Sequence, residues 1–148
     1  MTGGRVPRAP ALARLLWLFE RLRLGVYGFL VLGVGYVLWR YDRIELPAEG
    51  CSPLSLFVPG DRLLIDLRPG QIEVGAAVLY RGRAGELLLG RVQEPPPTAS
   101  AATWEAWDAR RALWIVGDRH DCPGPDSRSL GPIPAEGVEG RVVCALSW

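Results

Sequence analysis

The longest apolar stretch of the chain lies near its N-terminus. Residues 24–39 read LGVYGFLVLGVGYVLW and contain no charged side chain, while arginines flank the stretch on both sides. A helix of this length is about 24 Å long, which is short for a bilayer, but flanking arginine side chains reach the interface and extend it. The pattern predicts a single transmembrane helix over residues 24–39; the alternative is a buried core helix.

The arginines around this stretch predict its orientation. Five arginines precede it, whereas only two follow it closely. Because short cytoplasmic segments carry the excess of basic residues, the N-terminus is expected in the cytoplasm and the rest of the chain outside. Residues 1–23 then form an Arg-rich, amphipathic cytoplasmic segment that either lies along the inner leaflet or extends the helix. The expected location is the cytoplasmic membrane, crossed once, with membrane lipid as a partner.

A cleaved signal peptide also explains an N-terminal apolar stretch. Small residues at Ala48 and Gly50 resemble a cleavage site. Cleavage there would cut directly against a motif that begins at Gly50, so an uncleaved anchor is the preferred interpretation.

Short apolar runs after the anchor predict strands. The runs lie at residues 61–67, 74–80, 86–92, 112–116 and 140–146. The second and third flank the sequence Arg-Gly-Arg-Ala-Gly and therefore read as a hairpin. Residues 94–111 read as a loop with a helical turn near two tryptophans. The expected fold is mostly β: a single N-terminal transmembrane helix followed by one small β domain over residues 44–148.

Composition narrows the chemistry. The formal net charge is +1, which gives no argument for a nucleic-acid partner. All 17 basic residues are arginine, and His120 is the only histidine. The three cysteines fit no zinc spacing, so neither a metal nor another cofactor is expected.

Three motifs follow one another through the domain. Residues 50–61 read GCSPLSLFVPGD, residues 87–92 read LLLGRV, and residues 117–131 read GDRHDCPGPDSRSLG. The first matches the pattern G-x-S-M-x-P-T-L-x-x-G-D at its glycines, serine and aspartate, but has Pro53 for Met and Ser55 for Pro. The second matches a strand ending in K-R, with Gly90 for Lys. The third is close to G-D-N-x-x-N-S-x-D-S-R-x-F/W-G, with one extra residue between its two blocks. The matching residues are Gly50, Ser52, Gly60, Asp61, Arg91, Gly117, Asp118, Asp126, Ser127, Arg128 and Gly131.

In this order, behind an anchor, the motifs resemble those of type I signal peptidases, the membrane serine endopeptidases that remove signal peptides. The resemblance implies that Ser52 is the nucleophile and that the other matching residues, together with Gly90, shape the site. It also implies that an extended peptide or secretory precursor pairs with a strand edge beside Ser52. Asp126 and Arg128 are expected to form a structural ion pair.

The general base of the family is missing. A lysine, or in some relatives a histidine, stands in the family where this chain has Gly90, and Arg91 stays charged at any working pH. Two hypotheses follow. In the first, His120 is a relocated base, oriented by Asp118, Asp121 or Asp126. In the second, the chain is an inactive relative that acts as a secretion or assembly chaperone.

The cysteines give a geometric test of the resemblance. If the first and third motifs meet as in the family, Cys51 and Cys122 should form a disulfide, with Cα atoms about 4.4–6.8 Å apart. A metal site made of these cysteines and His120 would lack a fourth ligand. Cys144 lies in an apolar strand and is expected to be buried and free.

Overall fold

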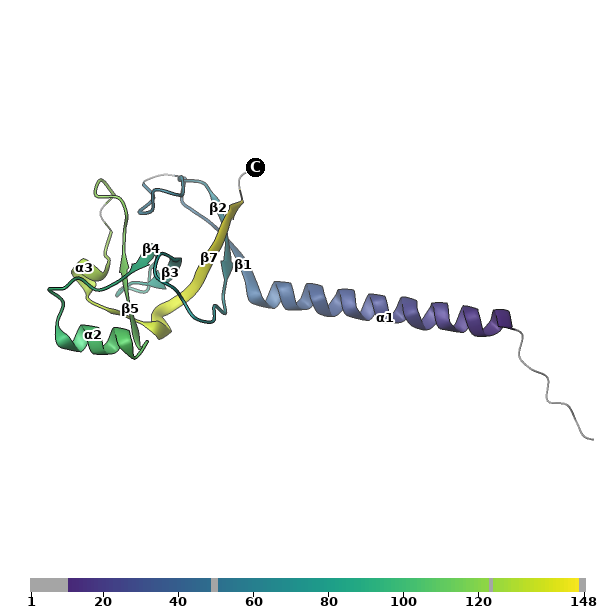
Figure 1. The fold of residues 1–148 in the computed structure, drawn as a ribbon. Coiled ribbons are helices and arrows are strands. Elements are labelled where there is room, and N and C mark those ends of the chain that lie inside the picture. Colours follow the sequence, from purple (N-terminus) through teal and green to yellow (C-terminus); the bar gives the residue numbers. More distant parts are fainter. Residues whose placement is uncertain (1–10, 49–50, 123, 147–148) are drawn as a thin grey trace, which may run out of the picture. The chain divides into compact units, whose positions relative to one another are not determined.

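The computed structural model describes residues 11–48, 51–122 and 124–146. The chain divides into two compact units, Met1–Trp39 and Arg40–Trp148. Figure 1 shows a long helix in the first unit and a strand-rich fold in the second.

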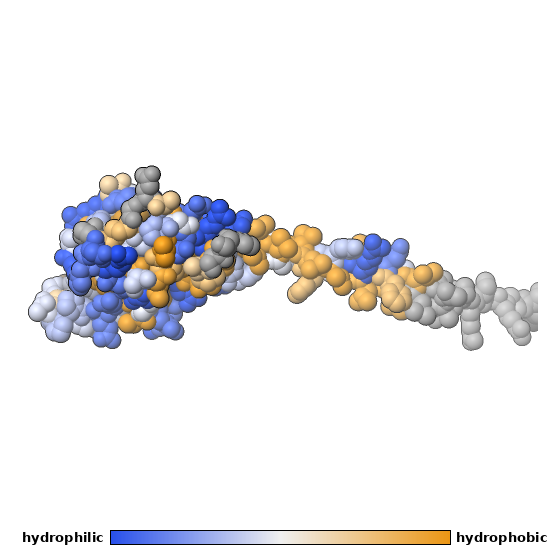
Figure 2. Space-filling model, turned by 90° about the horizontal axis from the view of Figure 1, so that it is seen from above, coloured by the Kyte–Doolittle hydropathy of each residue, from blue (hydrophilic) through white to orange (hydrophobic). Residues whose placement is uncertain are grey.

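The first unit contains one helix, α1, over Ala11–Arg40. Its segment Leu16–Arg40 is 25 residues long, contains an 18-residue window with a mean hydropathy of 1.6, and is long and apolar enough to cross a membrane. None of this window is buried, which does not support a core helix. A hydrophilic patch interrupts the hydrophobic surface of α1 in its N-terminal half (Figure 2).

The helix begins well before the predicted span of residues 24–39. From Ala11 on, the Arg-rich segment belongs to the same helix as residues 24–39. Of the two alternatives for this segment, the structure therefore agrees with the one in which it extends the helix. Leucine and arginine favour helix, and no glycine or proline interrupts residues 11–23. The Arg21 guanidinium lies 4.0 Å from the centroid of the Trp17 ring, one turn away. Residues 1–10, also part of that predicted segment, lie outside the described residues.

The second unit is a curled antiparallel sheet of seven strands in the order β1-β2-β7-β3-β4-β5-β6. The strands are β1 Tyr41–Glu45, β2 Arg62–Asp66, β3 Ala77–Arg81, β4 Leu87–Gln93, β5 Ala112–Val116, β6 Ile133–Pro134 and β7 Val138–Leu146. All five predicted strands are present, with the 112–116 strand at the expected bounds and the predicted hairpin formed by β3 and β4. Strands β1 and β6 were not predicted, and the second unit therefore begins before residue 44.

Short helices lie in the connections. The predicted loop over residues 94–111 contains α2, Ala101–Asp108, whose first turn is capped by Ser100. Helix α3 covers Ser127–Leu130, and a 3₁₀ turn, η1, covers Ala135–Gly137. The helical content of this unit is small, and the fold is mostly β as expected.

Two clusters of buried apolar side chains form the core. Consecutive residues of β3 alternate between them, because neighbouring side chains of a strand point to opposite faces: Leu79 belongs to one, and Val78 and Tyr80 to the other. Leu54 and Phe57, from the segment after Ser52, pack with Leu79 in the first cluster. This packing holds the Ser52 segment against the sheet.

A buried ion pair fixes the start of the second unit. The Asp66 side chain is 1% exposed, and its Oδ2 atom lies 2.9 Å from Nη2 of Arg40. The hydrogen bond from Arg40 lowers the pKa of Asp66 against the opposing effect of burial, and the Arg68 N–H bond adds to the lowering. Since a buried carboxylate is costly without a partner, Arg40 and Asp66 hold the entry to β1 against the end of β2.

Candidate functional site

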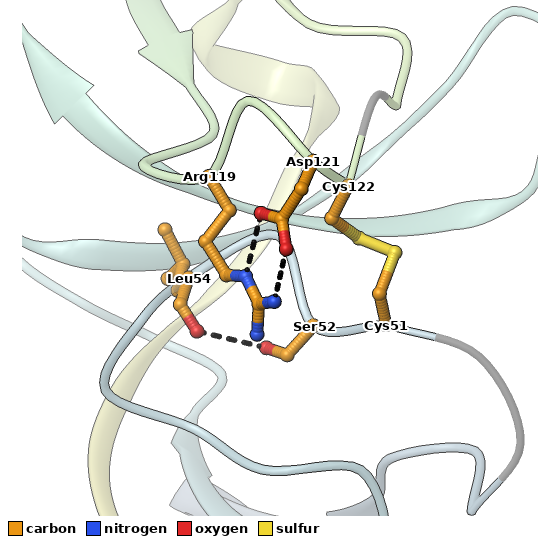
Figure 3. The surroundings of a disulfide bond; sticks show 6 residues. All are labelled: Cys51, Ser52, Leu54, Arg119, Asp121 and Cys122. Carbon is orange, nitrogen blue, oxygen red and sulfur yellow. Dashed lines mark hydrogen bonds and ion pairs between the residues drawn. A yellow bond between two sulfur atoms is a disulfide. The ribbon is translucent and has the colours of Figure 1, made fainter.

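The first and third motifs meet in the structure. Cys51 and Cys122 form a disulfide with Cα atoms 5.7 Å apart, inside the expected range (Figure 3). The Pro53 carbonyl accepts hydrogen bonds from the N–H groups of Asp118 at 2.9 Å and Arg119 at 3.2 Å. One covalent bond and two main-chain hydrogen bonds therefore tie the Ser52 segment to the loop that contains His120.

Ser52 is buried and its hydroxyl is already engaged. The residue is 3% exposed, and its Oγ donates a hydrogen bond to the Leu54 carbonyl at 3.0 Å (Figure 3). It lines a hollow of about 310 Å³, here called the Ser52 hollow. The other lining residues are uncharged: Leu46, Pro47, Cys51, Pro53, Pro59, Leu87, Leu88, Leu89, Cys122 and Gly124. No described side chain of the hollow accepts a proton at neutral pH.

Core side chains surround Gly90, the position to which the resemblance assigns the general base. A Cβ atom added to Gly90 would lie 2.5 Å from Cγ2 of Ile115 and 3.2 Å from Cε1 of Tyr80. Both neighbours belong to the second core cluster, so the glycine allows the strand and this cluster to approach closely. Gly90 does not line the Ser52 hollow. The structure thus leaves no space at Gly90 for a lysine or histidine side chain.

His120 lies in a different hollow from Ser52. It is exposed and lines a hollow of about 500 Å³ together with Glu94 and Trp114. The three aspartates suggested to orient its ring are each bound to an arginine: Asp118 to Arg91, Asp121 to Arg119 and Asp126 to Arg128. The structure does not bring Ser52, His120 and a free carboxylate together.

Arg91 of the second motif joins β4 to the loop of the third. Its Nε lies 3.0 Å and its Nη2 2.7 Å from carboxylate oxygens of Asp118, and its Nη1 donates to the Gly75 carbonyl at 2.8 Å. The hydrogen bonds to Asp118 raise the pKa of Arg91, which keeps it a permanent cation. The matched residues Arg91 and Asp118 therefore have a structural role: their ion pair links β4 to the loop of the third motif.

The Asp126-Ser127-Arg128 block contains the expected ion pair and also forms hydrogen bonds to the main chain. Asp126 caps α3, and its Oδ2 accepts bonds from Arg128 Nη2 at 2.6 Å and from the Gly117 N–H at 3.2 Å. Burial raises the pKa of Asp126, but these hydrogen bonds outweigh it, and the net shift is downward. The buried Ser127 hydroxyl accepts from the Ile115 N–H at 2.8 Å. The block fastens α3 to the end of β5.

Gly60 and Asp61 of the first motif belong to a turn. Oδ2 of Asp61 accepts a hydrogen bond from the Val58 N–H at 2.8 Å, and Gly60 has φ of 90°, a conformation that favours glycine. The turn leads the chain from the Ser52 segment into β2. Gly50 lies outside the described residues.

Two further features differ from or add to the sequence analysis. Cys144 is free, but it is exposed, because the last residues of β7 lie at the surface; the expectation of burial was wrong. The Tyr80 hydroxyl donates to the Pro125 carbonyl at 2.7 Å, and burial raises the pKa of Tyr80 to about 12. This contact supports the chain just before Asp126, and no motif pointed to it.

No metal site is evident among the residues that the structure describes. Within those ranges, no group of three His, Cys, Asp or Glu side chains comes together. Cys51 and Cys122, joined as a disulfide, offer no thiolate to a metal.

One edge of the hairpin has no strand partner, within the described ranges, beside the Ser52 hollow, where Leu87 is exposed and Leu89 is 7% exposed. The Val92 N–H donates to the Ala76 carbonyl, so even-numbered residues of β4 direct their main-chain groups to β3. The N–H and C=O groups of Leu87 and Leu89 therefore point to the other side. There β5 pairs only with Arg91–Gln93, and no strand of the described chain covers Leu87 and Leu89.

No model of a known protein family matches the chain, and no curated protein matches it. The resemblance to type I signal peptidases therefore rests on the three sequence motifs.

Proposed function

We propose that this chain is a membrane-anchored, catalytically silent relative of type I signal peptidases that binds extended peptides beside Ser52. The observation that carries the proposal is the open edge of β4 at Leu87 and Leu89, next to an uncharged hollow of about 310 Å³. The role that fits is a secretion or assembly factor that holds part of a precursor protein.

The silent character is supported by the surroundings of Ser52. A serine needs a general base to become a good nucleophile, and its absence costs about 10²–10⁴-fold or more. The Ser52 hydroxyl donates to a carbonyl, the position of the base is filled by core atoms, and the chain has no lysine. The residues that match the family outside Ser52 carry structural contacts, which an inactive relative would keep.

Peptide binding is supported by two features that act together. Unpaired N–H and C=O groups on a strand edge bind an extended chain through main-chain hydrogen bonds without demanding a fixed sequence. The leucine and proline lining of the Ser52 hollow favours small or apolar side chains on that peptide. Segments with these properties occur in the precursors on which signal peptidases act.

The proposed topology places the second unit outside the cytoplasm. Arginine asymmetry around α1 supports it, and so does the Cys51–Cys122 disulfide, since disulfides persist in oxidising compartments. A reporter active only outside the cytoplasm, fused after the last residue, should be active. Activity of a cytoplasm-only reporter at the same place would contradict this topology.

Binding is tested on the full-length protein in neutral detergent micelles. A fluorescent peptide of small and apolar residues is titrated against the wild type, Leu87→Pro and Leu87→Ala. Proline removes an outward N–H without breaking the bonds to β3, so affinity should fall about tenfold, whereas Leu87→Ala keeps the N–H and should lose less. Equal binding by the wild type and the proline variant would contradict strand addition.

Cleavage is measured in parallel with a fluorogenic signal-peptide substrate. The wild type and Ser52→Ala are both expected at the background rate. A rate above background that disappears in Ser52→Ala would show an active enzyme and reject the silent character, while leaving peptide binding in place.

A further inference from the structure

A polar hollow lies beyond the open edge of β4. It is the hollow of about 500 Å³ that contains His120, here called the Glu94 hollow, and its wall includes Glu94, Trp114 and Asp118. Its size is in the range of ligand pockets. Unlike the Ser52 hollow, it is lined by charged and aromatic side chains.

The charges of the Glu94 hollow leave one carboxylate unbalanced. Asp118 is paired with Arg91, and Arg128 is paired with Asp126, so these two pairs contribute no net charge. Glu94 is exposed and forms no hydrogen bond or ion pair with any residue in the described part of the chain. A free carboxylate beside a half-buried indole is a combination that attracts a cation, through charge and through the aromatic ring.

A third, smaller hollow joins the two. It shares Leu88 and Leu89 with the Ser52 hollow, and Gly117 and Arg128 with the Glu94 hollow. From Leu89 to Glu94 the chain advances about 17 Å at 3.4 Å per residue. Because β5 occupies the edge of β4 from Arg91 on, the bound peptide leaves the edge over this third hollow and reaches the Glu94 hollow about five residues further along.

We infer that the Glu94 hollow is a subsite for a basic side chain of the bound peptide. The recognised segment would carry an apolar residue at the Ser52 hollow and a lysine or arginine about five residues away. The inference rests on the proposed peptide binding and adds a charge requirement to it. Glu94 supplies the opposite charge, and Trp114 supplies the aromatic wall.

The test uses two fluorescent peptides that differ at one position, lysine in one and the neutral isostere norleucine in the other, five residues from a leucine. The full-length protein in neutral micelles should bind the lysine peptide about fivefold more tightly. Glu94→Gln should remove this preference and Trp114→Leu should reduce it. The control Glu136→Gln removes an exposed carboxylate outside the hollow and should leave the preference unchanged.

Equal affinity for the two peptides, or a preference that survives Glu94→Gln, would overturn the subsite while leaving peptide binding intact. If neither peptide binds, the proposed function fails, and the subsite is decided by Nα-acetyl-lysine methylamide. Its binding is followed by NMR at the indole N–H of Trp114, assigned with Trp114→Phe. A saturable shift that is lost in Glu94→Gln supports the subsite; no saturable shift overturns it.

Discussion

The segment around Asp126 and the segment around Ser52 both carry motifs that resemble those of signal peptidases, but the contacts of the two segments differ. Asp126 binds Arg128 and the Gly117 N–H, and caps α3. Around Ser52 the turn of Gly60 and Asp61 is present, yet the hydroxyl donates to the Leu54 carbonyl, and none of the described residues that line its hollow is a base. The comparison teaches that the contacts that build a site and the groups that perform its chemistry are separable.

The disulfide that joins the two segments gives the largest expected effect. Cys51 and Cys122 are separated by 71 residues, and closing a loop of that length stabilises the folded state by about 4 kcal/mol. The double variant Cys51→Ser, Cys122→Ser should lose free energy of unfolding of that order, measured by urea titration in micelles under oxidising conditions. Cys144→Ser, at an exposed free cysteine, is the control. An unchanged urea midpoint would mean that the two segments hold together without their covalent link.

Substitutions at Gly90 give the second-largest expected effect. Because a Cβ atom there would lie 2.5 Å from Ile115, Gly90→Lys should cost about 3 kcal/mol of stability and create no cleavage. The clash is isolated by making Gly90→Ala in the wild type and in Ile115→Ala, where the penalty of the added methyl should shrink. Signal-peptide cleavage by a stably folded Gly90→Lys protein would show that only the base was missing. The lack of chemistry around Ser52 would then be due to one residue.

A substitution at Asp126 tests how much the hydrogen bonds of its segment contribute to stability. Asp126→Asn removes the charge from a buried carboxylate and should cost about 2 kcal/mol at pH 7, given that its arginine partner is half exposed. Since the pKa of Asp126 is lowered, its stabilisation is fully present above the unfolded pKa of about 3.9 and is lost as pH falls through the folded pKa. The difference between wild type and variant should therefore shrink below about pH 4. Asp108→Asn, at an exposed aspartate, should show no such difference.

The sequence predicted the parts of the fold that carry an apolar signal. The strand at residues 112–116 and the hairpin were found because each is a short apolar run bounded by polar or turn residues. Strand β1 was missed because its sequence, YDRIE, has no apolar run, and it is held by pairing with β2. Helix α3 was missed because its four residues depend on the cap from Asp126, which no periodicity reveals.

The candidate site was predictable in its covalent and ionic contacts but not in its burial. The Cys51–Cys122 and Asp126–Arg128 pairs followed from the motifs. Asp66 was missed because its partner, Arg40, lies 26 residues earlier, and a charge at the end of a strand normally points to solvent. The burial of Ser52 depends on Leu54 and Phe57 packing on the sheet, a long-range effect that a local motif does not contain.

Ser52→Ala should have the smallest effect and is the most informative test of the comparison. The substitution removes one buried hydrogen bond, from Oγ to the Leu54 carbonyl, and should cost about 1 kcal/mol in urea titration. If Ser52 is a structural residue, the variant should bind the apolar peptide with the affinity of the wild type, because the open edge at Leu87 and Leu89 is untouched. Ser52→Thr is the matched variant: it keeps the hydroxyl but adds a methyl group at a site that is 3% exposed, and should destabilise at least as much as alanine. If Ser52 were a nucleophile, Ser52→Ala would instead abolish function at little cost in stability. Loss of a measurable biological activity in a Ser52→Ala protein of wild-type stability would therefore show that Ser52 takes part in a reaction. The Ser52 segment would then carry chemistry as well as structural contacts.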